Sequence, residues 1–142
     1  MTTPTANPAH ELTELATRLV ASCFDPPRPD AFAGFCSDER ACYLFTTIAE
    51  AFPDARFQVS WVVADSGRVA IGGRLDGTHL GPWRGVPATG RRFDVAGVVL
   101  LEVVGGTVVA MRTVTDSLAM AEQLAAVQPL EPPACRRYDA AH

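Results

Sequence analysis

Residues 93–115 have the sequence FDVAGVVLLEVVGGTVVAMRTVT, and this stretch decides the fold. Two mostly apolar runs, both rich in valine, flank the pair Gly105-Gly106. A Gly-Gly pair favours a two-residue hairpin turn, because glycine accepts the positive φ angles that such a turn requires. The stretch therefore predicts two antiparallel strands, over residues 93–104 and 107–115.

Two further strands are predicted before this hairpin. Over residues 57–63, Phe, Val, Trp and Val alternate with other residues, a period of two that predicts a strand with one buried face. The sequence Asp-Ser-Gly at residues 65–67 predicts a turn, and a second strand follows over residues 68–76. Residues 77–92 are rich in Gly, Pro and Arg, which predicts a long connection to the hairpin.

Helices are predicted on both sides of these strands. Apolar residues at helical spacing predict an amphipathic helix over residues 9–23, and residues 29–35 predict a short helical turn. Ser37 predicts the start of the next helix, because its hydroxyl can accept free backbone N–H groups and two acidic residues follow it. Pro53 ends that helix. A last helix is predicted over residues 116–127.

This order of elements predicts the α+β class. Helices that precede an antiparallel sheet must cover one of its faces. A bent sheet wrapped around the N-terminal helices would leave a pocket between the two layers, and such a pocket is the natural ligand site. The 142 residues suit one domain. We predict a flexible tail over residues 1–8, a single α+β domain over residues 9–127 and a Pro-containing C-terminal tail over residues 128–142.

The composition limits the possible binding partners of the protein and its possible location in the cell. The formal net charge is −4 and no long basic run occurs, so the sequence shows no footprint for nucleic acid or an anionic membrane. No window approaches the roughly 20 apolar residues of a membrane span, and the N-terminus lacks a signal-peptide pattern. These features predict a cytoplasmic protein. The cysteines form no C-x-x-C pair, which predicts free or buried thiols and no zinc site; they are Cys23, Cys36, Cys42 and Cys135.

Three stretches carry a family resemblance: AFPD at residues 51–54, GTHLG at 77–81 continued by GVPATGRRF at 85–93, and residues 106–124. Together they resemble the SnoaL-like polyketide cyclases, which belong to the nuclear transport factor 2 and ketosteroid isomerase-like superfamily. The resemblance implies a cone-shaped barrel of α+β class with an apolar pocket, no cofactor, no metal and often a homodimer. It also implies a hydrophobic small-molecule substrate, a polyketide-type natural product.

The match to the founding cyclases of this family is mixed at the site itself. Those proteins move protons in an aldol ring closure with an Asp that directly follows an Arg on the last strand. Here Arg112 matches that Arg, but Thr113 follows it, and a hydroxyl does not ionise near neutral pH. The founding members also point a Gln and a His into the pocket, where this chain has Gly97 and Val99. The comparison therefore implies a pocket that acts more by shape than by strong acid–base chemistry.

Three residues are candidates for catalysis. Asp116, an acid beside an apolar cavity, could shuttle protons, or it could cap the last helix. His79, which matches a His frequent in the family, could act as acid or base, or it could bind a loop carbonyl. Arg112 could hold a substrate carbonyl or enolate, pair with Glu102 or Asp94 across the sheet, or face solvent.

Seven residues are candidates for the wall of a substrate pocket. Most are apolar or aromatic, and the hydroxyl groups among them could bind a substrate oxygen. The alternative is a plain structural role, because apolar residues at these spacings are what a core requires. The seven candidates are Tyr43, Phe45, Trp61, Val99, Leu101, Met111 and Thr113.

Three functions remain open from the sequence. The first is a cofactor-independent SnoaL-like cyclase or isomerase that acts on a hydrophobic polyketide-type intermediate. The second is dehydration, epoxide opening or double-bond migration in the same pocket, which needs a buried acid or base with a perturbed pKa. The third is a non-catalytic protein that binds a small apolar molecule, since a fold does not determine a function.

Overall fold

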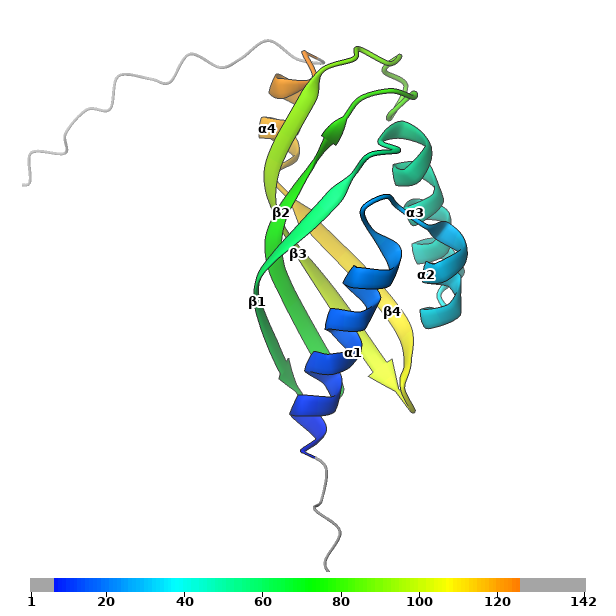
Figure 1. The fold of residues 1–142 in the computed structure, drawn as a ribbon, viewed down its shortest axis with the longest axis vertical. Coiled ribbons are helices and arrows are strands. Elements are labelled where there is room, and N and C mark those ends of the chain that lie inside the picture. Colours follow the sequence, from blue (N-terminus) through cyan, green and yellow to red (C-terminus); the bar gives the residue numbers. More distant parts are fainter. Residues whose placement is uncertain (1–6, 126–142) are drawn as a thin grey trace, which may run out of the picture.

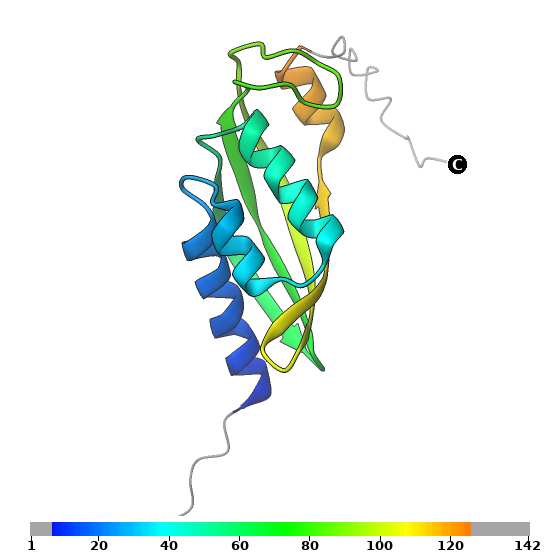
Figure 2. The same ribbon diagram turned by 90° about the vertical axis from the view of Figure 1, so that its right-hand side faces the viewer.

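The computed structural model describes residues 7–125, in which helices cover one face of a four-stranded antiparallel sheet (Figures 1 and 2). In chain order the elements are α1 (Pro8–Cys23), α2 (Pro29–Phe35), α3 (Glu39–Ala51), β1 (Arg56–Asp65), β2 (Arg68–Thr78), β3 (Arg92–Val104), β4 (Thr107–Thr115) and α4 (Ser117–Gln123). The strands lie in the order β1-β2-β3-β4, so each strand pairs with its neighbour in the chain. The α+β prediction is confirmed.

The sheet bends around the helices but stays open. Hydrogen-bonded pairs join β1 to β2, β2 to β3 and β3 to β4, and within residues 7–125 none joins β1 to β4. The predicted cone-shaped barrel is therefore corrected to an open, bent sheet. The physical reason is the strand number, because four strands are too few to close around a layer of helices.

Two hairpins turn on residues with positive φ, as the sequence predicts. Ser66 and Gly67, with φ of 50° and 76°, join β1 to β2. Gly105 and Gly106, with φ of 57° and 78°, join β3 to β4. Two central residues with positive φ suit a two-residue hairpin, because the twist of such a turn matches the twist of the strands. These turns set the register of the sheet.

A β-bulge in β1 changes which side chains face the helices. The register between β1 and β2 shifts between Val59 and Trp61, which brings Val62 to an inner position against the core. Trp61 and Val63 lie on the outer face, where they are 47% and 62% exposed. The single buried face predicted for residues 57–63 is therefore wrong, because one extra residue in a strand reverses its alternation.

Capping side chains begin α1 and α3. Asn7 accepts a hydrogen bond at 3.1 Å from a backbone N–H in the first turn of α1. Asp38 accepts one at 3.1 Å from the Arg40 N–H at the start of α3. Ser37 is not the predicted cap, because its N–H donates to the Val108 carbonyl on β4 at 2.9 Å and the Asp38 carboxylate takes the capping position.

Aromatic side chains fill the layer between the helices and the sheet. The rings of Phe32 and Phe45 stack with their centroids 4.6 Å apart, and Phe24 meets Phe45 edge-on at 5.2 Å. Burial beside this layer raises the pKa of the Cys23 thiol to about 11, so this thiol stays protonated and inert near neutral pH.

Three cysteines, Cys23, Cys36 and Cys42, are free thiols as predicted, whereas Cys135 lies outside the described residues. The predicted C-terminal tail, residues 128–142, and most of the predicted N-terminal tail also lie outside them. Within residues 7–125, no helix has both the length and the apolar character needed to cross a membrane.

Residues 79–91, called the strap below, cross one end of the fold between β2 and β3 (Figure 2). The N–H groups of Leu80 and Gly81 both donate to the Ala51 carbonyl at the end of α3, at 2.9 and 3.1 Å. A Cβ atom at position 81 would overlap the Glu50 carbonyl oxygen, so the close approach requires glycine. The strap is therefore fixed over the end of α3.

Asp54 holds β2 where the strap begins. Its carboxylate accepts hydrogen bonds from the N–H and the hydroxyl of Thr78, both at 2.7 Å. Burial raises the pKa of Asp54, but these bonds, with the guanidinium of Arg92 nearby, outweigh it and leave the pKa below its ordinary value.

The substitution Asp54→Asn is expected to lower the free energy of unfolding by about 1 kcal/mol at pH 7, a modest effect because the side chain is 43% exposed and solvent screens it. The folded-state pKa is depressed, so the stabilisation is present above about pH 4 and is lost as the pH falls through the folded-state pKa. Urea unfolding between pH 2 and 7 should show that the difference in the free energy of unfolding between wild type and Asp54→Asn becomes smaller as the pH falls. Asp65→Asn is the control. A difference that is as large at pH 2 as at pH 7 would contradict this account.

Candidate functional site

An apolar cavity of about 90 Å³ lies beneath the strap, between α3 and the inner face of the sheet. On the inner face, Val99 lies opposite Thr113, and Gly97 lies opposite Thr115. Gly97 leaves room there because it has no side chain. The apolar lining comes from the residue that follows α1, from α3 and its C-cap, from the sheet, where Val98 contributes from the outer-facing side of β3, and from the strap and α4. It consists of Phe24, Leu44, Ile48, Phe52, Phe57, Leu75, Trp83, Val98, Val99 and Met120.

Three polar side chains line this cavity. They are Thr113 and Thr115 on β4 and Arg84 on the strap. A hydroxyl can donate or accept a hydrogen bond, whereas a guanidinium only donates. The described lining includes no carboxylate and no histidine, and within residues 7–125 no cluster of three His, Cys, Asp or Glu side chains could hold a metal ion. The cavity can therefore bind and orient a substrate oxygen.

A second cavity, of about 170 Å³, adjoins the first. Both cavities are lined by Trp83, Arg84, Thr115 and Met120, so these side chains lie between them. Neither volume reaches the roughly 300 Å³ of a typical small-molecule site. A bulky ligand would therefore need the side chains that line both cavities to rearrange, so that the two spaces join and widen.

A wider hollow, of about 810 Å³, opens to solvent between the start of α3 and β4. Tyr43, Met111 and Arg112 line it, together with Leu44, which also lines the inner cavity. Tyr43 is 77% exposed on the surface of α3. Three of the predicted site residues thus meet at this hollow, which borders the inner cavity at Leu44.

Asp116 caps α4, which is the structural alternative that the sequence left open. Its carboxylate accepts a hydrogen bond at 3.0 Å from the Ala119 N–H, and the residue is exposed. It does not line the inner cavity. Its catalytic role stays a prediction.

His79 is fully buried at the start of the strap. Its Nδ1 accepts a hydrogen bond from the Thr89 N–H at 3.3 Å and lies 3.0 Å from the Thr89 hydroxyl. Because a backbone N–H only donates, the ring proton is assigned to Nε2. Nε2 is buried without a hydrogen-bond partner among the described residues, and the ring centroid lies 5.7 Å from that of Phe52. His79 ties the two ends of the strap together and lines neither cavity.

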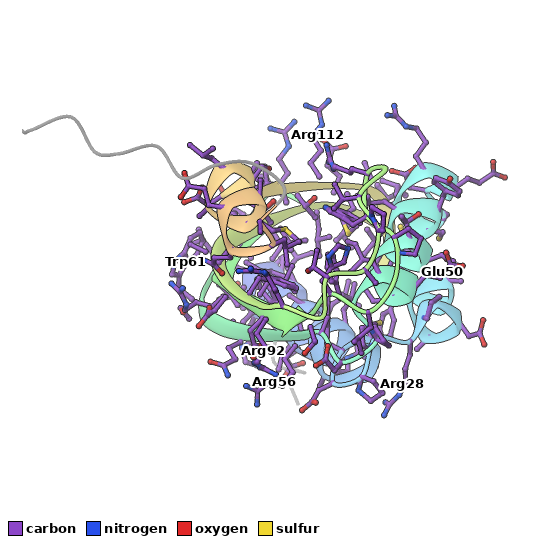
Figure 3. The ribbon with its side chains drawn as sticks, turned by 90° about the horizontal axis from the view of Figure 1, so that it is seen from above. Arg28, Glu50, Arg56, Trp61, Arg92 and Arg112 are labelled. Atoms are coloured by element: carbon purple, nitrogen blue, oxygen red, sulfur yellow. The ribbon has the colours of Figure 1, made fainter. Side chains whose placement is uncertain are left out.

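Trp61 lies on the outer face of the sheet, on the side opposite α2 and α3, whereas Arg112 lies at the edge strand β4, where it also borders the hollow beside α3 (Figure 3). The Trp61 ring lies flat over Gly72, where a Cβ atom would overlap it. Trp61 therefore cannot line the inner cavity, contrary to the expectation for this residue. Arg112 makes no ion pair within residues 7–125, so the predicted pairing with Glu102 or Asp94 does not form.

The predicted pocket residues thus separate into some that line the inner cavity and others that lie elsewhere in the fold. Val99 and Thr113 line the inner cavity, whereas Phe45 and Leu101 are core residues, each 2% exposed. The structure does not bring Asp116, His79 and Arg112 together at one cavity. The sequence also does not single out Trp83, Arg84 and Thr115, which line the inner cavity. The one signal for the first two is a Trp-Arg pair inside a connection that is rich in Gly and Pro.

The fold and the cavity define a class of protein, in which a bent antiparallel sheet and its covering helices enclose an apolar cavity. The sequence model of the SnoaL-like polyketide cyclases matches residues 37–124, more than half of the chain. The chain therefore belongs to the SnoaL-like polyketide cyclase family, which confirms the resemblance seen in the sequence.

Solved structures share this fold. A candidate SnoaL-like polyketide cyclase from Jannaschia sp. CCS1 is 25% identical with a TM-score of 0.76, covering 92% of this chain and 100% of its own. AclR from Streptomyces galilaeus, a candidate hydroxylase, is 24% identical with a TM-score of 0.75, covering 87% and 86%. TsrD from Streptomyces laurentii is 18% identical with a TM-score of 0.72, covering 83% and 97%. A comparison with curated proteins found no match.

Proposed function

We propose that this protein is a cofactor-independent cyclase or isomerase that holds a hydrophobic polyketide-type molecule between α3 and the sheet. The observation that carries the proposal is the lining of the inner cavity. Apolar side chains surround it on nearly every side, and two hydroxyls on β4 provide a polar strip. Membership of the SnoaL-like polyketide cyclase family supports the reaction class.

The proposed chemistry depends mainly on shape. A flexible chain held in a reactive conformation can lose about 7–11 kcal/mol of its barrier when the reacting atoms are well aligned. In a ring closure, a carbon nucleophile adds to a carbonyl and its oxygen gains negative charge. The hydroxyls of Thr113 and Thr115 would donate hydrogen bonds to that oxygen. The reaction is redox-neutral, so it needs no electron carrier.

The exposed position of Thr113 suggests how protons would reach this site. Thr113 is on β4, the edge strand of the sheet, and belongs to both the cavity wall and the exposed surface. Solvent water could therefore exchange protons with a ligand there. The catalytic roles of Asp116, His79 and Arg112 are not needed in this scheme and stay predictions, as do dehydration, epoxide opening and double-bond migration.

A second candidate function is a non-catalytic protein that binds a small apolar molecule. It is favoured by one observation, that the described lining of the inner cavity includes no carboxylate and no histidine. Without an acid or base of suitable pKa, proton transfer depends on solvent and on the ligand itself. Binding without turnover would then be the whole activity.

Turnover of a linear, apolar 1,3-diketone that carries a third carbonyl further along its chain, within reach of the carbon between the first two, would separate these two functions. Without any added cofactor, the proposed enzyme should convert it over many cycles to a cyclic product of the same mass, or of that mass less one water. The variant Thr115→Val keeps the shape but removes a hydroxyl, and it should lower kcat by about tenfold or more with little change in affinity. Saturable binding with no product would instead establish the binding protein.

The homodimer that the family resemblance implies also stays a prediction. The apolar surface available for it is the outer face of the sheet, where the register places Gly72 between Trp61 and Val98 and places Val98 beside Val114. Trp61 and Val114 are 47% and 60% exposed there. An exposed apolar face of this kind can pair with its own copy about a two-fold axis.

A further inference from the structure

Arg84 is the charged side chain at the place where the two cavities under the strap meet, and it lines both of them. The other charged side chains of the strap region differ from it. Arg92 lies within 4 Å of the carboxylates of Asp54 and Asp76, and Arg91 lines neither cavity. Arg84 is exposed to solvent, and among the described residues it is the one charged residue that lines either cavity.

The backbone holds Arg84 in an unusual position. Trp83 and Val86 exchange two backbone hydrogen bonds, at 2.9 and 2.8 Å, around a two-residue turn made of Arg84 and Gly85. Both turn residues have positive φ, 48° and 79°. Glycine adopts this conformation freely, but for an arginine it costs about 1–2 kcal/mol. Backbone strain of this kind occurs preferentially at ligand-binding and catalytic sites.

The guanidinium of Arg84 is positioned but not neutralised. Its Cζ lies 5.5 Å from the centroid of the Trp83 ring, an arrangement in which the ring attracts the cation. Within residues 7–125 no carboxylate forms an ion pair with Arg84, and neither cavity is lined by Asp or Glu. Its N–H donors are therefore available to a ligand, and a planar guanidinium suits a carboxylate in particular.

We propose that Arg84 is a specificity-determining residue that binds a carboxylate, so that the ligand of this protein is an apolar molecule with one anionic end. The apolar body would lie against Val99 and Met120, and the carboxylate would lie at the mouth formed by Trp83 and Arg84. This inference rests on the proposed function, because it concerns the ligand of the same cavity, and it adds the charged group that this ligand carries.

The test compares cis-parinaric acid, a fluorescent polyene carboxylate, with its methyl ester, which has the same apolar body and no charge. Wild-type protein should bind the acid about tenfold more tightly than the ester in low salt. Arg84→Gln should remove this preference by weakening acid binding about tenfold, and it should leave ester binding within about twofold. Arg84→Lys should keep most of the preference because it keeps the charge. Arg91→Gln, which removes an equal charge from the same strap, is the matched control.

The outcomes separate the inference from the proposed function. Ester and acid that bind wild type equally, or an Arg84→Gln variant that keeps its preference for the acid, would overturn the role of Arg84 while leaving the apolar site intact. An equal loss in Arg91→Gln would also overturn it, because the effect would then come from net charge alone. Binding of neither probe would overturn the proposed function and this inference with it.

Discussion

Replacement of Thr113 by tryptophan is expected to reduce the affinity for cis-parinaric acid by roughly a hundredfold, equivalent to about 2.7 kcal/mol. Thr113 faces inward beside Val99, at the side of the cavity that is open to solvent. An indole ring at this position would occupy the space between α3 and β4. Because the native side chain is exposed, the larger residue should not prevent folding, and a thermal melt measured beside the fluorescence titration checks this.

The neighbouring residue supplies the control for this experiment. Val114 is 60% exposed and, one residue along β4, points to the opposite face of the sheet. Val114→Trp adds the same ring to the same strand but outside the cavity, so its affinity for the probe should stay near that of wild type. Equal losses in the two variants, or full binding by Thr113→Trp, would place the ligand somewhere other than the inner cavity.

The substitution Gly73→Ala is expected to lower the free energy of unfolding by about 3 kcal/mol, a large effect for one methyl group. Gly73 is a residue of β2 and pairs with Val59 beside the bulge of β1. A Cβ atom at position 73 would overlap the carbonyl oxygen of Gln58. That oxygen belongs to the backbone, so it cannot move aside as a side chain could. The bulge and the inner face of β2 would have to shift together.

Gly34→Ala is the matched control for Gly73→Ala. Gly34 lies within α2, and a Cβ atom there has no heavy atom within 4 Å. Alanine is favoured over glycine in a helix, so this variant should be about 0.5–1 kcal/mol more stable than wild type. Urea unfolding of both variants measures the difference. If Gly73→Ala were as stable as wild type, the close approach of β1 to β2 would not constrain the sheet.

Local patterns in the sequence predict most of the fold. The glycines at 105 and 106 predict the hairpin because their positive φ is a local property. The bulge in β1 is different, because it depends on how β1 pairs with β2 over Gly72 and Gly73. No alternation of residues within β1 reveals this, and Trp61 was therefore expected on the inner face. The open sheet likewise depends on strand number and curvature rather than on any one motif.

The candidate site is only partly predictable from sequence, for a related reason. Val99 and Thr113 line the cavity, because strand periodicity fixes the face on which they lie, and their contact with a substrate stays a prediction. Arg84 lies in a connection without periodicity, so only the turn between Trp83 and Val86 shows where it is. His79 pairs with Thr89, ten residues along the chain, and its burial could not be deduced from its neighbours in the sequence.

A crystal structure of the protein with cis-parinaric acid is the most direct test of the proposed ligand site. The expected result is a polyene chain between α3 and the inner face of the sheet, in contact with Val99 and Thr113, with its carboxylate beside Arg84 and the two cavities joined. A probe bound instead in the hollow of about 650 Å³ that Val63 and Leu100 line on the outer face of the sheet would contradict the account.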